Sequence, residues 1–260
     1  GGGVAYIRSI DAIEKMKEAG VRKVIPLAVS GGFHSRCMDS AWKKIELDLQ
    51  NIRNEVTDLV SHVENIVVTA VKSLVERDKE MATKIVESDT YVNQKEVDIE
   101  ESCLKVLALH QPVAMDLRYL IGVIKLNNDI ERIADLAVNV AERALYLVKA
   151  DPVILPFDIH IMSQETCNML QNTIKALFEK DKDLARAVIK RDQVIDEMNR
   201  EMYDLIFKAI RKNPDKVDVY INYLSAGRHL ERIADYCTNI AEDLIYMEEG
   251  IIIRHHPELL

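Results

Sequence analysis

ERIADLAVNVAERALY, at residues 131–146, is matched one hundred residues later by ERIADYCTNIAEDLIY, at residues 231–246. An earlier pair of segments, LVERDKEMATKIVESD (74–89) and LFEKDKDLARAVIKRD (177–192), is separated by 103 residues. The three-residue difference falls between the two pairs, where HQPVAMDLRYL stands opposite the shorter KNPDKVDVYI. Two matches in the same order, with one loop deletion, predict a tandem duplication.

The duplicated region has the apolar spacing of helices. From about residue 38, apolar side chains recur three or four positions apart, and prolines stand at the expected joints. Few glycines and prolines and 5% aromatic residues also favour an all-α fold. We expect six long helices, at residues 39–77, 79–110, 113–149, 158–180, 182–212 and 214–249. Short turns between long helices predict antiparallel packing in bundles.

The duplication also predicts the domain organisation. We expect an atypical, α/β-like N-terminal extension, a first three-helix repeat, a second three-helix repeat and a C-terminal tail, at residues 1–37, 38–150, 151–250 and 251–260. ADPVILPF, at 150–157, is the evident linker and separates three helices from three.

Composition narrows the class of function. A net charge of −9 argues against a general affinity for nucleic acid or anionic lipid, and favours cations or basic patches on a partner. The four cysteines form no CxxC pair, which indicates neither a disulfide framework nor a zinc knuckle. The sequence has no 18-residue apolar run and no signal-peptide pattern at its start. We therefore expect a soluble protein of the reducing cytoplasm.

The ERIAD segments carry a polar stripe. Each helical residue turns by about 100°, so residues spaced three or four apart share one face. In the first copy this stripe contains Glu131, Asp135, Asn139 and Glu142, and in the second Glu231, Asp235, Asn239 and Glu242. The preceding helix carries a matching set, with Asp89, Asn93, Glu96 and Glu100 in the first copy and Asp192, Asp196 and Asn199 in the second. Antiparallel packing would bring the two acidic faces together.

Converging carboxylates require a counter-charge. Two of them about 4 Å apart repel by roughly 4 kcal/mol at an effective dielectric of 20. Arg132 and Arg232 offer part of that charge, and a plain helical scaffold with a solvated acidic face is one interpretation. The duplication beside an apolar face favours metal binding instead. Oxygen ligands suit magnesium, manganese or iron, whereas zinc usually recruits histidine or cysteine.

Signatures of enzymes are scarce in the sequence. It contains no P-loop, no GxSxG elbow and no dinucleotide-binding glycine motif. No ExxH motif accompanies the acidic positions, and His229 is expected to be a surface or interface residue. A carboxylate metalloenzyme built on a helical bundle remains the alternative to a binding protein.

These residues resemble the PhoU family of phosphate transport system regulatory proteins. The resemblance covers residues 38–256, including both ERIAD segments, the ERDKE segment and the ending YMEEGIIIRHH. It implies a cytoplasmic, six-helix adaptor without catalytic activity, which often forms homodimers and represses the phosphate-starvation response when phosphate is plentiful. It also implies two partners, the ATPase of the phosphate ABC transporter and the phosphate-sensing histidine kinase.

The same resemblance implies metal sites. The E(D)xxxD motif of the family carries multinuclear clusters, and it maps onto Glu131 with Asp135 and onto Glu231 with Asp235. Helical facing adds Asp89, Asn93, Asp192 and Asp196. The bound metal would be iron, manganese, magnesium or zinc. Because Asn93 stands where the second repeat has Asp196, we expect the two sites to differ in charge and occupancy.

Residues 1–36 depart from the family. GGGVAYIRSIDAIEKM resembles a stretch of the group I chaperonins, and VIPLAVSGGFHS resembles the part of malonyl-CoA acyl carrier protein transacylases that leads to their active-site histidine, here His34. The GxSxG serine of the transacylases is missing from the sequence, so we expect no activity from His34.

Overall fold

The computed structural model describes residues 36–87 and 89–254, with side chains from residue 43 onward except at 89. Contacts divide the chain into residues 1–43 and 44–260, and the description below concerns the second unit. Expectations about the N-terminal extension fall outside the described residues.

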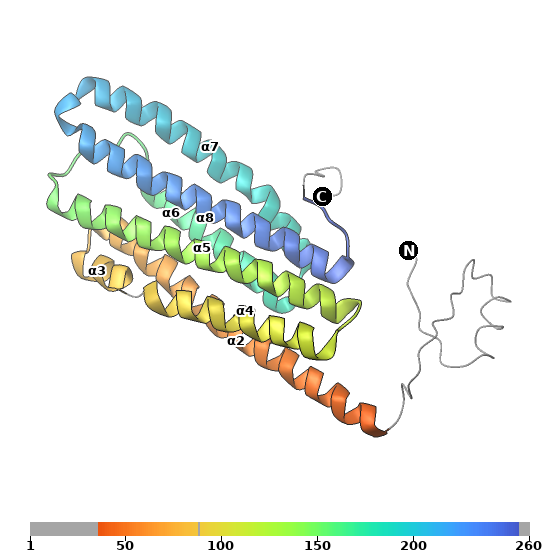
Figure 1. Ribbon diagram of the computed structural model, residues 1–260. Coiled ribbons are helices and arrows are strands. Elements are labelled where there is room, and N and C mark those ends of the chain that lie inside the picture. Colours follow the sequence, from red (N-terminus) through yellow and green to blue (C-terminus); the bar gives the residue numbers. More distant parts are fainter. Residues whose placement is uncertain (1–35, 88, 255–260) are drawn as a thin grey trace, which may run out of the picture. The chain divides into compact units, whose positions relative to one another are not determined.

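Every regular element in the described residues is helical, as predicted (Figure 1). The first repeat contains α2 (Arg36–Glu76), α3 (Lys79–Glu87), α4 (Asp89–His110) and α5 (Met115–Lys149). The second contains α6 (Ile159–Glu179), α7 (Lys182–Lys212), the short 3₁₀ helix η1 (Pro214–Lys216) and α8 (Val217–Glu249). The helix limits agree with the expected ones to within three residues at all but one position.

The exception lies in the first repeat. One helix was expected at 79–110, but the structure has two, α3 and α4, with residue 88 between them. In the second repeat α7 passes through the corresponding stretch as one helix.

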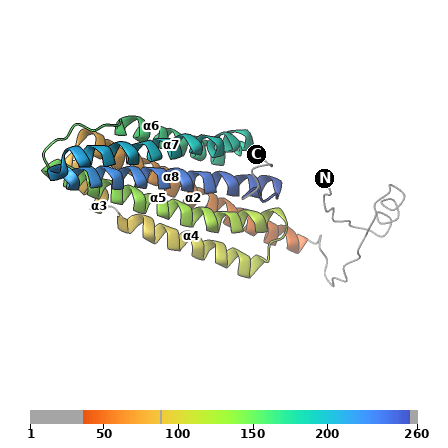
Figure 2. The same cartoon turned by 90° about the horizontal axis from the view of Figure 1, so that it is seen from above.

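Helices α5 and α8 form the centre of the bundle. Figures 1 and 2 show α7, α8, α5 and α4 in succession, and α5 contacts α8 directly. The pair is antiparallel, because Lys125 near the start of α5 meets Asp243 near the end of α8, at 3.4 Å. At the opposite end, Arg143 donates to Asn222, also at 3.4 Å. We call this α5–α8 contact the seam.

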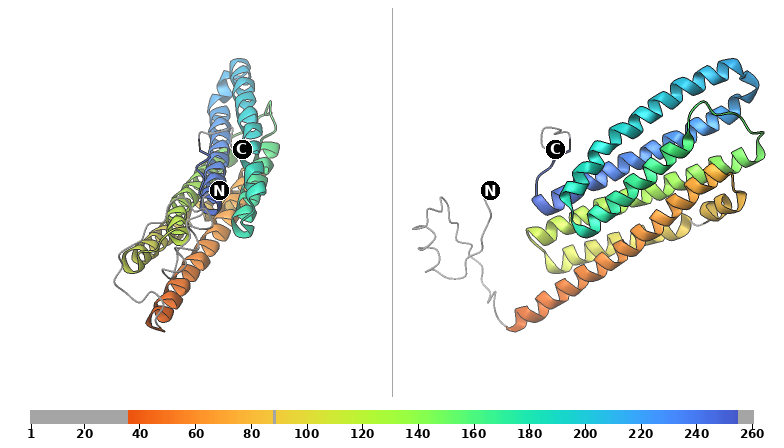
Figure 3. Two further views of the ribbon diagram at one scale, coloured as in Figure 1. Left: turned by 90° about the vertical axis from the view of Figure 1, so that its right-hand side faces the viewer. Right: turned by 180° about the vertical axis from the view of Figure 1, so that it is seen from behind.

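The seam belongs to a continuous apolar core. Ile133 and Ala134 of α5 are buried, as are their counterparts Ile233 and Ala234 of α8. Side chains of α2 and α6 line one apolar space together with α5 and α8, so both outer helices pack behind the seam in the view of Figure 1. The left view of Figure 3 looks nearly along the bundle, with α4 on one side and α6 on the other. In the described residues no helix has the length and apolar character needed to span a bilayer.

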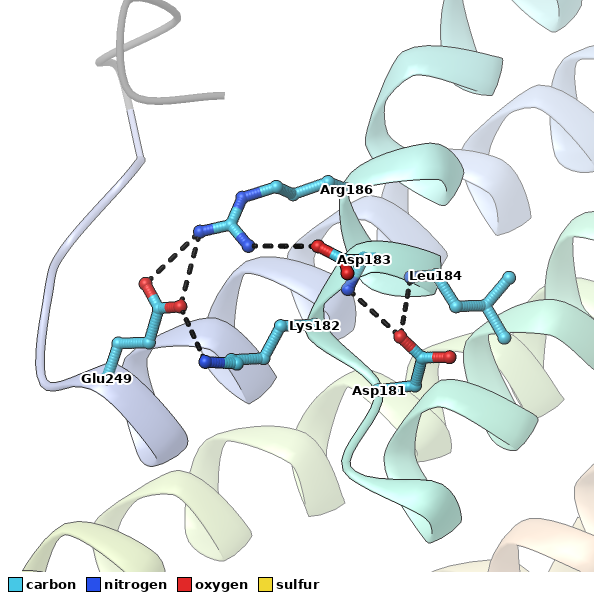
Figure 4. Close-up of polar contacts among 6 residues, drawn as sticks. All are labelled: Asp181, Lys182, Asp183, Leu184, Arg186 and Glu249. Atoms are coloured by element: carbon cyan, nitrogen blue, oxygen red, sulfur yellow. Dashed lines mark hydrogen bonds and ion pairs between the residues drawn. The ribbon is translucent and has the colours of Figure 1, made fainter.

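The turns after the first helix of each repeat have the same backbone conformation. Arg77 and Lys180 occupy matching positions, and both are left-handed, with φ of 53° and 56°. The aspartate that follows each of them begins the next helix: Asp78 accepts a hydrogen bond from the backbone N–H of Met81 at 3.0 Å. Asp181 likewise accepts from two backbone N–H groups at the start of α7 (Figure 4). The shared turn therefore explains why the sequence RDK at 77–79 is repeated as KDK at 180–182.

The side chains of Arg77 and Lys180 contact different groups. The Arg77 guanidinium donates to the carbonyls of Leu147 and Ala150, the latter at 2.6 Å, and so caps the end of α5. The Lys180 ammonium lies 2.9 Å from the carboxylate of Glu248 near the end of α8. Both contacts tie the turn to the third helix of the repeat, but only Arg77 donates to backbone carbonyls at the end of that helix.

Glu249, the last residue of α8, adds a second tie in the repeat that contains Lys180. Its carboxylate contacts the Lys182 ammonium at 3.0 Å and the Arg186 guanidinium at 3.1 Å (Figure 4). Both cations come from the first turns of α7. The end of α8 is thus fixed to the start of α7 by charge, whereas the end of α5 is fixed by backbone hydrogen bonds.

Replacing Arg77 by alanine is expected to destabilise the protein by about 2 kcal/mol, because it removes the charged donor of two hydrogen bonds to the carbonyls of Leu147 and Ala150. Both residues have a Cβ atom, so the left-handed backbone is equally unfavourable in the two proteins. Lys180→Ala is the matched control, and it should cost under about 1 kcal/mol because its partner is an exposed ion pair. Urea unfolding followed by circular dichroism measures both, and equal effects of the two substitutions would contradict the capping role.

Candidate metal sites in the two repeats

The second repeat brings the predicted carboxylates together. Asp192 and Asp196 stand one turn apart on α7, and Asp235 comes from α8. Carboxylate oxygens of these three residues all lie within 4.8 Å of one another. Asp192 and Asp196 are half-buried and Asp235 is exposed, so the group is open to solvent on one side. The expectation that the acidic faces of adjacent helices meet is confirmed in this repeat.

The group holds more negative charge than its surroundings offset. Burial, followed by the charges of Asp235, Asp196 and Glu231, raises the pKa of Asp192 to about 7. Burial and the neighbouring aspartates also raise the pKa values of Glu231 and Asp235. Asp192 Oδ1 is shielded from solvent and has no hydrogen-bond partner in the described structure. The site therefore favours either a proton or a cation.

The donors of this site suit a hard cation. All four acidic side chains offer oxygen atoms only, which is the ligand set of magnesium, manganese and iron in carboxylate sites. Cys237 on α8 is fully buried, and burial raises its pKa to about 12, so it offers no thiolate. The residues present thus fit a divalent cation or iron held between α7 and α8.

His229 plays no part in this donor set. Its Nε2 lies 3.3 Å from the Ser225 hydroxyl. Burial lowers the pKa of His229, and so do nearby arginines, of which Arg143 across the seam has the largest effect. Its position agrees with the expectation of an interface residue.

The corresponding residues of the first repeat are arranged differently. Arg132 Nε lies 3.5 Å from the Glu131 carboxylate, and Arg132 Nη1 lies 3.7 Å from that of Asp135. Asn93 follows on α4, while the side chain of Asp89 is outside the described structure. Among the described side chains, a convergent group of three acidic, histidine or cysteine ligands occurs only in the second repeat.

The outer members of the predicted stripes form other contacts. Asn139 donates to the backbone carbonyl of Asp135 at 2.8 Å. Glu142 pairs with Arg143 at 3.2 Å, and Glu242 pairs with Arg254 at 3.2 Å. The compact part of each stripe is therefore the ExxxD pair itself.

An acidic pair at the seam was missed by the sequence analysis. Asp243 is 5% exposed, and its carboxylate lies 3.4 Å from Lys125 and 3.9 Å from Arg254. Burial and then the charge of Asp243 raise the pKa of Asp129 on α5 to about 6. A comparison of the two repeats could have pointed to this pair, because their charges differ at matching positions. The first repeat has Asp129 and Arg143, and the second has His229 and Asp243.

Metal-free protein should lose stability as pH rises, because the folded state holds a proton on Asp192 more tightly than the unfolded chain does. That stabilisation is complete below about pH 4 and is lost as pH passes through about 7. Asp192→Asn removes the loss, so in chelator the variant should exceed wild type at pH 8 by roughly 1 kcal/mol, or about 2–4 °C in melting temperature, and match it near pH 4. Glu197→Gln, at an exposed position on α7, is the control, and a pH-independent difference for Asp192→Asn would contradict the assignment.

Comparison with known families supports the duplication. The PhoU domain profile matches residues 56–144 and 159–244, one match in each repeat. The phosphate-specific transport system accessory protein PhoU homolog 1 of Thermotoga maritima is 32% identical over 209 residues, which are 79% of this chain and 89% of the relative. The PhoU homolog of Aquifex aeolicus is 31% identical over 212 residues, or 82% and 96% of the two chains.

Solved structures agree with the sequence relatives. The crystal structure of PhoU from Pseudomonas aeruginosa aligns with a TM-score of 0.77 at 31% identity, and covers 79% of this chain and 99% of that one. PhoU from Streptococcus pneumoniae aligns with a TM-score of 0.71 at 30% identity, and covers 80% and 98%. With both repeats matched and these identities over most of its length, the chain belongs to the PhoU family.

Proposed function

We propose that this protein is a regulatory accessory protein of phosphate uptake, which represses the phosphate-starvation response when phosphate is plentiful. Support comes from the names of its relatives, among them the phosphate-specific transport system accessory protein PhoU of Serratia marcescens, 29% identical over 208 residues. It acts as an adaptor in the cytoplasm and carries out no reaction of its own.

The proposed partners are the ATPase of the phosphate ABC transporter and the phosphate-sensing histidine kinase. An accessory role in a transport system requires contact with one of its components, and the ATPase is the component that faces the cytoplasm. The net charge of −9 favours association with basic patches on such a partner. The protein works as a homodimer in this proposal.

The adaptor binds metal at the carboxylates of the second repeat. The observation that carries this part is the convergence of Asp192, Asp196 and Asp235 within 4.8 Å, beside Glu231. When bound, a divalent cation or iron, as one ion or a multinuclear cluster, supplies the positive charge that these residues lack. The carboxylates then hold α7 against α8 and present a less acidic surface to the partner.

Metal analysis tests this part directly. Protein purified without chelator should contain iron, manganese, magnesium or zinc, and Asp192→Asn with Asp235→Asn should remove most of it. A cation at a hundred times its dissociation constant stabilises the folded state by about 2.7 kcal/mol. That rise in stability should be present in wild type and in Glu197→Gln, and absent from the double variant. Retention of the metal by the double variant would contradict the site.

The regulatory role is tested in cells of the source organism that lack the gene. A phosphate-starvation reporter should become active in high phosphate, and the wild-type gene should silence it again. Purified protein should also bind the purified transporter ATPase, and the double variant tells whether that binding depends on metal. A reporter that stays silent without the gene, together with no binding to the ATPase or to the kinase, would contradict the proposal.

A further inference from the structure

The two carboxylate sites occupy equivalent places but differ in their side chains. Adding 103 to a position on α4 gives its counterpart on α7, so Asn93 corresponds to Asp196 and Glu96 to Asn199. The acid and the amide have exchanged places along the helix by about one turn. The second repeat therefore has its acid beside the ExxxD pair, and the first has an amide there.

The arginine between the paired acids makes different contacts in the two repeats. In the first repeat Arg132 is shared by Glu131, at 3.5 Å, and Asp135, at 3.7 Å. Its charge also reaches α4: burial and Glu100 raise the pKa of Glu96, and Arg132 lowers it. Arg132 thus has acidic groups on both helices of the groove.

Arg232, at the same place in the second repeat, is positioned differently. It is exposed, and among the described side chains it makes no ion pair within 4.0 Å. Asn199, which carries no charge, stands in the sequence where the first repeat has Glu96, and Arg228 stands one turn from Arg232 where the first repeat has Asn128. Like charges at this spacing repel. The charge of Arg232 still lowers the pKa values of Glu231 and Asp235, but in the described structure it forms no ion pair with either within 4.0 Å.

From this contrast we infer that Arg132 is a built-in counter-ion of the first repeat, so that cations bind the second repeat first and bind the first repeat only by displacing Arg132. This inference rests on the proposed metal binding. Its physical basis is competition for the same carboxylates. In the second repeat Arg228 and Arg232 act on the acids from beyond ion-pair distance, whereas a cation entering the first repeat must release the pairs of Arg132 with Glu131 and Asp135. The Arg132 side chain is half-exposed, so its displacement is readily reversible.

The expected size of the effect follows from the strength of such pairs. An exposed ion pair contributes up to about 1 kcal/mol, and two of them shared by one arginine contribute somewhat more. Since 1.4 kcal/mol is a factor of ten, the two sites should differ in affinity by roughly tenfold. The protein would then exist in a half-loaded form over about one decade of free cation concentration.

Titration of the metal-free, full-length protein with Mn²⁺ tests this inference, with free Mn²⁺ followed by electron paramagnetic resonance. Wild type should show a tight and a weak class of sites. Arg132→Gln should strengthen the weak class by roughly tenfold and bring the two together, whereas the matched control Arg232→Gln should change either class by less than about threefold. Asp192→Asn with Asp235→Asn should abolish the tight class alone.

Three results would overturn the inference. Wild type could bind Mn²⁺ in one class with two equal sites, Glu131→Gln with Asp135→Asn could remove the tight class, or Arg132→Gln could leave the weak class unchanged. Each of these three results would still be compatible with the proposed metal binding. Wild type that binds no Mn²⁺ would overturn the metal site and this inference together. Thermal unfolding of every metal-free variant confirms that it is folded before titration.

Discussion

The antiparallel seam between α5 and α8 is the contact on which the rest of the structure depends. Small buried residues such as Ala134 and Ala234 let the two helices approach closely, beside Ile133 and Ile233. Once this face of each helix is buried, its carboxylate stripe points to the side, towards α4 in one repeat and α7 in the other. The same packing thus stabilises the bundle and positions both acidic grooves.

Much of the fold could be predicted from the sequence because helical periodicity and internal repetition are local signals. The duplication, the limits of most helices and the meeting of Asp192 with Asp235 all follow from spacing. One helix was predicted at 79–110, where the structure has α3 and α4. The different behaviour of Arg132 and Arg232 was beyond prediction, since ERIAD is identical in both copies and the difference comes from facing helices.

The acidic group of the second repeat is a local conflict between stability and binding. Burial and neighbouring carboxylates raise the pKa values of Asp192 and Asp235, so their charges weaken the metal-free bundle, yet the same charges attract a cation. In the first repeat an arginine of the chain itself relieves part of that conflict. The two carboxylate grooves therefore differ in how far the arginine of their own helix neutralises them.

The charges at the seam affect which repeats can pair with each other. Asp129 corresponds to His229 and Arg143 to Asp243, yet across the seam Asp129 lies near Asp243 and His229 near Arg143. Two acids therefore meet at one end of the seam, with Lys125 offsetting them, and at the other end Arg143 helps to lower the pKa of His229. If two first repeats were paired instead, Asp129 of one would meet Arg143 of the other, and two second repeats would join His229 to Asp243. Each half is electrostatically complementary to itself, and it is the covalent linker and the shared apolar core that hold the unlike halves together.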